Sequence, residues 1–116
     1  MQKVAMIGAS GHGPGFCVPT VPSDDRTFVA VAPGSVGESV DGLVQRIRNI
    51  GGQPTVYNDY ETLLRESRPD VVVVDNFYGE HAPLVAAAFR AGCHVFAEKP
   101  AAATPEQVAQ LYDAWQ

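Results

Sequence analysis

Apolar residues in this chain gather in short runs separated by segments with helical spacing. Three runs, 4–7, 28–31 and 71–74, are almost continuously apolar. Such runs predict strands that are covered on both faces, as in a parallel sheet between two layers of helices. Two shorter runs, 55–57 and 94–97, complete a set of five predicted strands.

Helical patterns fill most of the intervals between these runs. A capping box of Ser35 with Glu38 predicts the start of one helix, and Asp59 predicts the start of a second. Residues 81–91 form a third, alanine-rich pattern, and Thr104 is the predicted N-cap of a last helix.

Only a short or distorted helix is expected after the first strand, because three prolines lie between residues 14 and 22. Strands that alternate with helices predict an α/β fold, a doubly wound parallel sheet with right-handed crossovers and strand order 3-2-1-4-5. The 116 residues are the length of one domain, 1–116. The ligand crevice of such a sheet opens between the first and fourth strands.

Small residues follow the first strand at the place where dinucleotide folds bind phosphate. The segment reads Gly8-Ala9-Ser10-Gly11-His12-Gly13. Glycines let the backbone approach a pyrophosphate, and amides at the following helix start bind its charge. We therefore expect cofactor contacts from Gly8, Ser10, Gly11, His12 and Gly13, with His12 as a neighbour of the phosphates.

The acid that usually binds the adenosine ribose is missing after the second predicted strand, where the sequence reads Ala32-Pro33-Gly34-Ser35. Ser35 either hydrogen-bonds a ribose hydroxyl or 2′-phosphate, or merely caps the next helix. No arginine stands beside it, so the pattern leaves NAD and NADP equally open as the cofactor.

Polar and aromatic residues follow the fourth and fifth strands. Asn76 and Phe77 are expected to line the nicotinamide pocket, and His81 either joins them or simply begins a helix. The run Glu98-Lys99-Pro100 sets an acid and a base at the end of a parallel strand, and all three residues are also expected to contact the cofactor. A lysine there can orient a substrate hydroxyl or share in proton transfer during hydride transfer, so Lys99 and Glu98 are the predicted catalytic pair.

Composition and charge exclude several classes of binding partner for this chain. A net charge of −5 and a pI of about 4.9 argue against nucleic-acid and anionic-membrane binding. No apolar run reaches the roughly 20 residues of a membrane span. Cys17 and Cys93 form neither a disulfide framework nor a metal motif, and the chain begins without a signal peptide, so we expect a cytoplasmic protein without a bound metal.

Taken together, these features resemble the cofactor domain of the glucose–fructose oxidoreductase / inositol dehydrogenase / MocA (Gfo/Idh/MocA) family. The resemblance rests on the Gly8–Gly13 turn and on segments 57–64, 69–74 and 91–100. It implies a Rossmann fold and an NAD(P)-dependent oxidoreductase acting on sugars, cyclitols or related polyols. It also implies that Lys99 contacts the substrate and the nicotinamide ribose, and that Glu98 supports it.

Several features depart from that family. Ser10 replaces its middle glycine, and Phe77-Tyr78 stands where a Pro-Asn pair is common. The family's second domain, which supplies most of the substrate pocket and a catalytic histidine, is absent. The chain is therefore expected to be an isolated cofactor domain, inactive alone. A non-enzymatic NAD(P)-binding or sensing module and an interaction scaffold without cofactor binding are the alternatives.

Self-association is also expected. The fifth strand would be an edge without proline or inward charge to block pairing, and Tyr112 and Trp115 would lie exposed on the last helix. We therefore predict a homodimer formed through that strand, that helix, or both.

Overall fold

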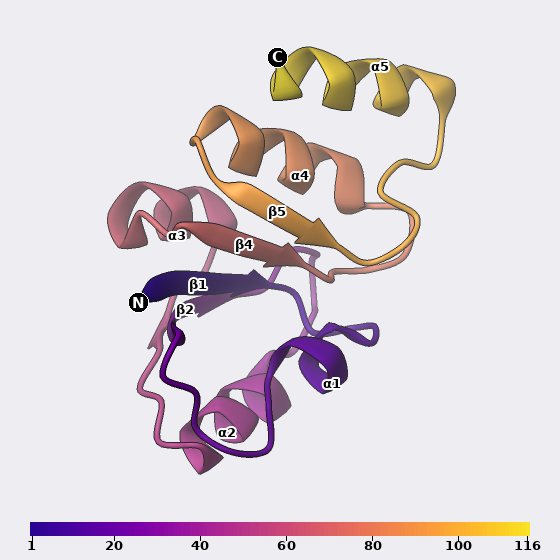
Figure 1. The fold of residues 1–116 in the computed structure, drawn as a ribbon. Coiled ribbons are helices and arrows are strands. Elements are labelled where there is room, and N and C mark those ends of the chain that lie inside the picture. The colour runs from indigo at the N-terminus through magenta and orange to yellow at the C-terminus, as the bar shows by residue number, and fades with distance from the viewer.

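One five-stranded parallel sheet organises the chain in the computed structural model, which describes residues 1–116 (Figure 1). Its order is β3-β2-β1-β4-β5, which confirms the predicted order. The strands are β1 (Gln2–Ile7), β2 (Arg26–Ala32), β3 (Thr55–Val56), β4 (Val71–Val74) and β5 (His94–Ala97). The helices are α1 (Gly13–Cys17), α2 (Asp41–Asn49), α3 (Tyr60–Ser67), α4 (His81–Arg90) and α5 (Pro105–Trp115).

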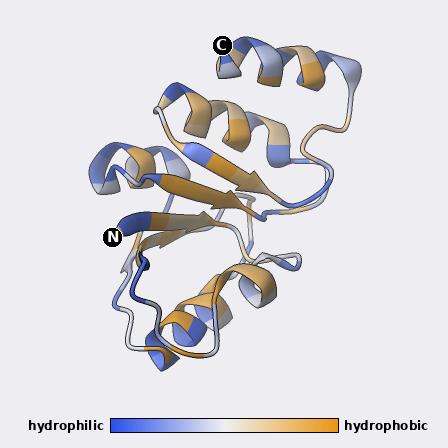
Figure 2. Cartoon of the chain, in the orientation of Figure 1, coloured by the Kyte–Doolittle hydropathy of each residue, from blue (hydrophilic) through white to orange (hydrophobic).

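Two apolar clusters pack on the two faces of the sheet. Ala5 and Ile7 of β1 face the cluster that contains residues of α3 and α4, whereas Val4 and Met6 face the cluster that contains residues of α2. Strand side chains alternate between faces, so covering both faces requires the continuous apolar runs seen in the sequence. Figure 2 shows these strands as the most hydrophobic ribbon of the molecule. Helix α5 lies outside this arrangement and packs on α4 (Figure 1).

Two of the three predicted caps are confirmed. The Asp59 carboxylate accepts a hydrogen bond from Thr62 N at 2.7 Å, and the Thr104 hydroxyl accepts one from Gln107 N at 3.1 Å. The predicted capping box of Ser35 and Glu38 is wrong as a helix start, because α2 begins at Asp41 without a side-chain cap. The Ser35 hydroxyl binds the loop after β4, and the Glu38 carboxylate binds both its own loop and the loop after β1.

Helix α1 has only five residues, as the prolines predict. It begins with Gly13 and Pro14, and at Val18 the backbone is already extended. The short α1 leaves the Phe16 side chain exposed. Its first residue, Gly13, is nevertheless buried, so the start of α1 packs against the rest of the fold.

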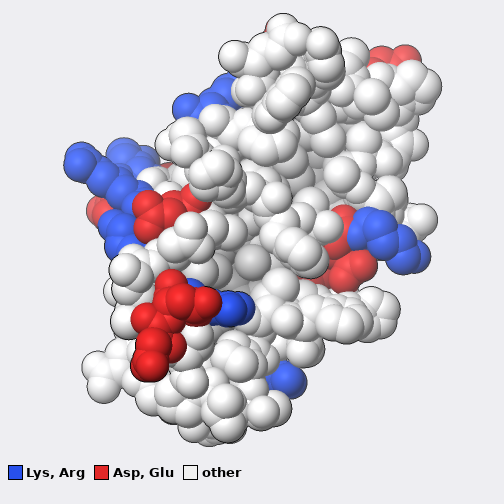
Figure 3. Space-filling model, viewed as in Figure 1, with Lys and Arg blue, Asp and Glu red and all other residues white.

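Charged side chains are scattered in small groups over the face shown in Figure 3. No helix in the fold has the length and apolar character needed to cross a membrane.

Candidate functional site

The loops that follow β1, β4 and β5 meet at the carboxyl end of the sheet (Figure 1). They enclose a small cleft of about 160 Å³, lined by Ser10, Gly11, His12, Asp75, Asn76, Tyr78, His81, Glu98 and Lys99. Seven of these were predicted from the sequence, and Asp75 and Tyr78 were not. The other five predicted residues lie outside the lining: Gly8, Gly13, Ser35, Phe77 and Pro100.

Gly8 makes the first turn of the cleft possible. Its φ of +91° belongs to the region that glycine adopts without strain. A Cβ atom at this position would overlap the backbone of Asn76, in the loop after β4. The glycine therefore lets the loops after two adjacent strands approach each other closely.

Three carboxylates accept hydrogen bonds from backbone amides of the glycine loop. Ala9 N donates to Glu38 at 3.0 Å, Gly13 N donates to Asp75 at 2.8 Å, and His12 N donates to Glu98 at 3.1 Å. These amides thus already bind anionic oxygens. The same donors suit the pyrophosphate of a dinucleotide, which would compete with the partly exposed Glu98 but not with the buried Asp75.

Asp75 is one of the two lining residues that were not predicted from the sequence. Its side chain is fully buried, and its Oδ1 atom has no hydrogen-bond partner. Burial raises the pKa of the Asp75 carboxyl, and the nearby Glu98 carboxylate raises it further. A Cβ atom at Gly13 would lie 2.6 Å from Asp75 Oδ2, so the Asp75 carboxylate can pack against the loop only because residue 13 is a glycine. In the sequence, the feature that could have pointed to Asp75 is its position directly after the apolar run Val71–Val74.

Replacing Asp75 with asparagine is expected to remove a pH-dependent loss of stability. In the unfolded chain the carboxyl ionises at about pH 4, whereas in the fold its pKa is higher. Below about pH 4 the carboxyl is protonated in both the folded and the unfolded state, so the free energy of unfolding of the wild type is not reduced there. As the pH rises from about 4 through the folded pKa, this free energy falls, because the unfolded state loses the proton more readily. Urea unfolding should show Asp75→Asn gaining on the order of 1 kcal/mol over the wild type between pH 4 and pH 8.

Asp113→Asn, on the exposed side of α5, is the matched control for this measurement. The gain over the wild type between pH 4 and pH 8 should be larger for Asp75→Asn than for this control. A gain no larger than that of the control would mean that burial does not raise the pKa of the Asp75 carboxyl.

Glu98 and Lys99 follow β5 and lie beside the glycine loop. The hydrogen bond from His12 N holds the pKa of the Glu98 carboxyl below its usual range, and Lys99 N donates a second bond at 3.2 Å. The Lys99 side chain is exposed and forms no salt bridge within the chain. Glu98 thus joins the end of β5 to the glycine loop, and the Lys99 ammonium is available to a bound molecule.

His81 connects the loops of the cleft. Its Nδ1 atom lies 2.8 Å from the Pro100 carbonyl oxygen, and its Nε2 atom lies 3.0 Å from the Asn76 carbonyl oxygen. The ring is buried, so it begins α4 and at the same time holds the backbone after Lys99 in place. The prediction that His81 begins a helix is confirmed, and its contact with the nicotinamide stays a prediction.

Ser35 and Asn76 join the loops after β2 and β4. The Ser35 hydroxyl accepts hydrogen bonds from Asn76 Nδ2 at 3.0 Å and from Phe77 N at 3.1 Å. Asn76 Oδ1 is buried without a partner, beside the cleft that Asn76 lines. An unpartnered acceptor of this kind suits the amide or hydroxyl donors of a nicotinamide riboside.

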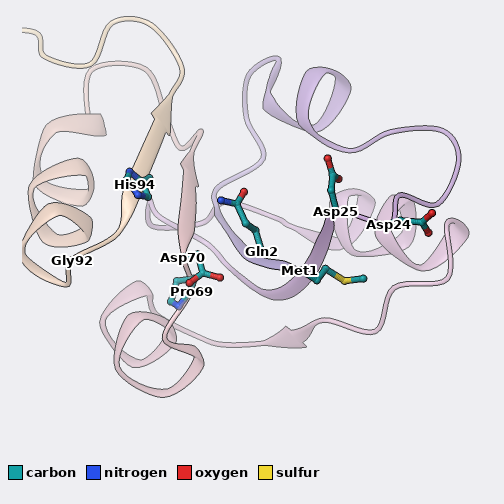
Figure 4. A pocket seen from close by; sticks show the side chains of 8 residues that line it. All are labelled: Met1, Gln2, Asp24, Asp25, Pro69, Asp70, Gly92 and His94. Carbon is teal, nitrogen blue, oxygen red and sulfur yellow. The ribbon is translucent and has the colours of Figure 1, made fainter.

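A larger, open hollow of about 570 Å³ lies at the amino-terminal ends of the strands, opposite to the glycine loop. Figure 4 shows its side chains, among them Asp24, Asp25, Asp70 and His94, spread around a wide opening. The Asp70 carboxylate accepts a hydrogen bond from Lys3 N at 2.8 Å, a contact within the fold. Because ligands of open α/β sheets bind at the carboxyl ends of the strands, the smaller cleft is the candidate site.

Known proteins match nearly the whole chain. Residues 2–116 match GFO_IDH_MocA, described as an oxidoreductase family with an NAD-binding Rossmann fold. D-glucoside 3-dehydrogenase of Escherichia coli (strain K12) is 33% identical over 96% of this chain. D-xylose 1-dehydrogenase (NADP(+)) 2 of Haloferax volcanii is 30% identical over 93% of it.

Among solved structures, myo-inositol dehydrogenase from Lactobacillus casei in complex with NAD(H) and myo-inositol has a similar fold. It superposes with a TM-score of 0.78 at 26% identity, covering 98% of this chain and 33% of that one. The two curated relatives are covered over 30% and 32% of their lengths. The chain therefore spans about a third of the length of these relatives.

Proposed function

Since this chain belongs to the Gfo/Idh/MocA oxidoreductase family, with its NAD-binding Rossmann fold, we propose that it is the cofactor-binding part of an NAD(P)-dependent oxidoreductase acting on a sugar, cyclitol or related polyol. One observation carries the proposal. Ser10, Gly11 and His12 of the glycine loop line the same cleft as Glu98 and Lys99. A site for a dinucleotide and a group for proton transfer are thus adjacent.

Each group has a distinct role in this proposal. Amides of the glycine loop bind the pyrophosphate, and Asn76 Oδ1 accepts a hydrogen bond from the nicotinamide end. The bound nicotinamide supplies the hydride acceptor or donor. Lys99 contacts the substrate hydroxyl and the nicotinamide ribose, and shares in the transfer of the hydroxyl proton. Glu98 is a positioning residue, because its carboxylate accepts a hydrogen bond from Lys99 N and so orients the end of β5.

Calorimetric titration with NAD, NADH, NADP and NADPH tests the proposed function. We expect weak binding of at least one cofactor, in roughly the millimolar range, because the chain titrated spans only about a third of the length of the relatives that it matches. Binding without turnover in a longer protein that contains this domain would favour a sensing module. No heat with any of the four at millimolar concentration would contradict the proposal and favour an interaction scaffold.

A homodimer is the oligomeric state that we propose. Strand β5 is at the edge of the sheet, and its Phe96 side chain is 56% exposed. Tyr112 and Trp115 of α5 are 60% and 65% exposed. An open strand edge beside exposed aromatic residues favours pairing with a second copy. Light scattering should give the mass of a dimer, and a monomer mass at high micromolar concentration would contradict this.

The cytoplasm is the proposed location. Cys17 and Cys93 are both unpaired in the fold, and Cys93 is buried. Free thiols of this kind fit a reducing compartment.

A further inference from the structure

Asp75 is the one buried acid of the fold, and it lines the candidate cleft. Its two carboxyl oxygens differ in their partners. Oδ2 accepts a hydrogen bond from Gly13 N at 2.8 Å, whereas Oδ1 is buried without a partner. A buried charge that is only partly hydrogen-bonded is unfavourable, because it has lost its hydration. A proton on Oδ1 removes the charge and leaves the hydrogen bond from Gly13 N intact.

The groups that face Asp75 do not supply a counter-charge. Burial raises the pKa of the Asp75 carboxyl, the hydrogen bond from Gly13 N opposes this, the Glu98 carboxylate after β5 raises the pKa further, and His81 at the start of α4 lowers it least. On α1, burial and the Asp75 charge both raise the pKa of the Cys17 thiol. Neither salt bridge of the fold involves Asp75. The cations that line the cleft, Lys99 and a protonated His12, are both exposed to solvent.

Segment 11–13 of the glycine loop lies directly against two carboxyl groups. A Cβ atom at Gly11 would overlap Asp75 Oδ1 and would lie 3.1 Å from Glu98 Cγ. Between the two glycines, His12 N donates to Glu98 at 3.1 Å. This segment therefore already contacts the negative charge of Glu98, and it contacts a second negative charge whenever Asp75 is ionised.

We infer that Asp75 is the proton-binding residue of the dinucleotide site, and that the cleft takes up a proton at this carboxyl when a dinucleotide binds. Each phosphate of a bound pyrophosphate brings a negative charge to the loop segment that contacts Asp75. Like charges repel strongly where water is excluded. Transfer of a proton from solvent to Oδ1 forms an O–H bond, neutralises the carboxylate and removes this repulsion. The inference rests on the proposed function, because it requires that the glycine loop binds the pyrophosphate.

Calorimetric titration from about pH 5 to about pH 9 tests the inference, using whichever of NAD, NADH, NADP and NADPH binds most tightly. Each pH is measured in two buffers of different ionisation enthalpy, which gives the number of protons taken up. Across this range the dissociation constant of the wild type should rise roughly tenfold more than that of Asp75→Asn, and the wild type should take up more protons, by at most about one for each cofactor bound. Asparagine resembles the protonated carboxyl, so the variant should bind about as tightly as the wild type does at low pH. Asp113→Asn, an equal charge change on the exposed side of α5, should keep the wild-type profile.

Equal pH profiles and equal proton uptake for the wild type and Asp75→Asn would overturn the inference and leave the proposed function intact. Histidine side chains also gain a proton in this range, so His12→Asn is the second variant. It should retain the proton uptake, and loss of that uptake in His12→Asn alone would assign the proton to His12 instead of Asp75. Binding of none of the four cofactors would overturn the proposed function, and the inference with it. Urea unfolding verifies that Asp75→Asn is folded when titrated, and if it is not, uptake by the wild type and by His12→Asn decides the question.

Discussion

Gly8→Ala is expected to destabilise the fold by about 3 kcal/mol or more, a large share of the roughly 5–15 kcal/mol by which native proteins are stable. Two costs add at this position. An L-residue at a φ of +91° is strained, and the new methyl group would overlap the backbone of Asn76. Backbone atoms cannot move aside as a flexible side chain does, so the loops after β1 and β4 would have to separate. The midpoint of urea unfolding, followed by circular dichroism, measures the effect.

Gly15→Ala is the matched control, since it makes the same change seven residues later. A Cβ atom at Gly15 meets nothing within 4 Å, and its φ lies outside the region that favours glycine. This variant should keep the wild-type midpoint or exceed it by up to about 1 kcal/mol in stability. Equal midpoints for Gly8→Ala and the wild type would show that the first turn does not need a glycine.

In a longer oxidoreductase that contains this domain, Lys99→Ala is expected to lower the turnover number by roughly 100-fold or more, the usual effect of losing a positioned proton-transfer group. Cofactor affinity should change much less, because the glycine-loop amides that we propose as the pyrophosphate site are unaffected. Steady-state kinetics with saturating cofactor and substrate measures the first effect, and calorimetry measures the second.

Arg90→Ala removes a positive charge of similar exposure at the far end of α4, and should leave turnover unchanged. If Lys99→Ala retains the wild-type turnover number, Lys99 has no part in proton transfer. A loss of cofactor affinity as large as the loss of turnover would instead make Lys99 a binding residue.

Local interactions explain why so much of the fold could be predicted from the sequence. A continuous apolar run is by itself enough to predict a strand that is buried on both faces, and such runs predicted β1, β2 and β4. The caps at Asp59 and Thr104 join residues three positions apart. The short α1 follows from the fixed geometry of its prolines. Because these features involve neighbouring residues, the sequence pattern contains nearly all of the necessary information.

The candidate site was predicted in outline for a related reason. Parallel strands bring their carboxyl ends to one edge, so residues after β1, β4 and β5 had to meet there. That rule places Ser10, His12, Glu98 and Lys99 near one another without any knowledge of their contacts. It does not say which side chains point into the cleft and which bind the fold itself.

Those assignments depend on contacts between residues far apart in the chain, and only the tertiary structure decided them. The local pattern suggested that Glu38 caps a helix with Ser35. Its carboxylate does accept a hydrogen bond from Ser35 N, but no helix begins there, and it also binds Ala9, 29 residues away. No role for Asp75 was predicted from the sequence, yet its buried carboxylate accepts a hydrogen bond from Gly13 N, 62 residues away. By itself the sequence determined the strands, most of the helix starts and the edge of the sheet where the site lies. The partners of its carboxylates were decided by the packing of the loops, because a buried or loop-bound carboxylate takes whichever amide donors the folded backbone brings to it.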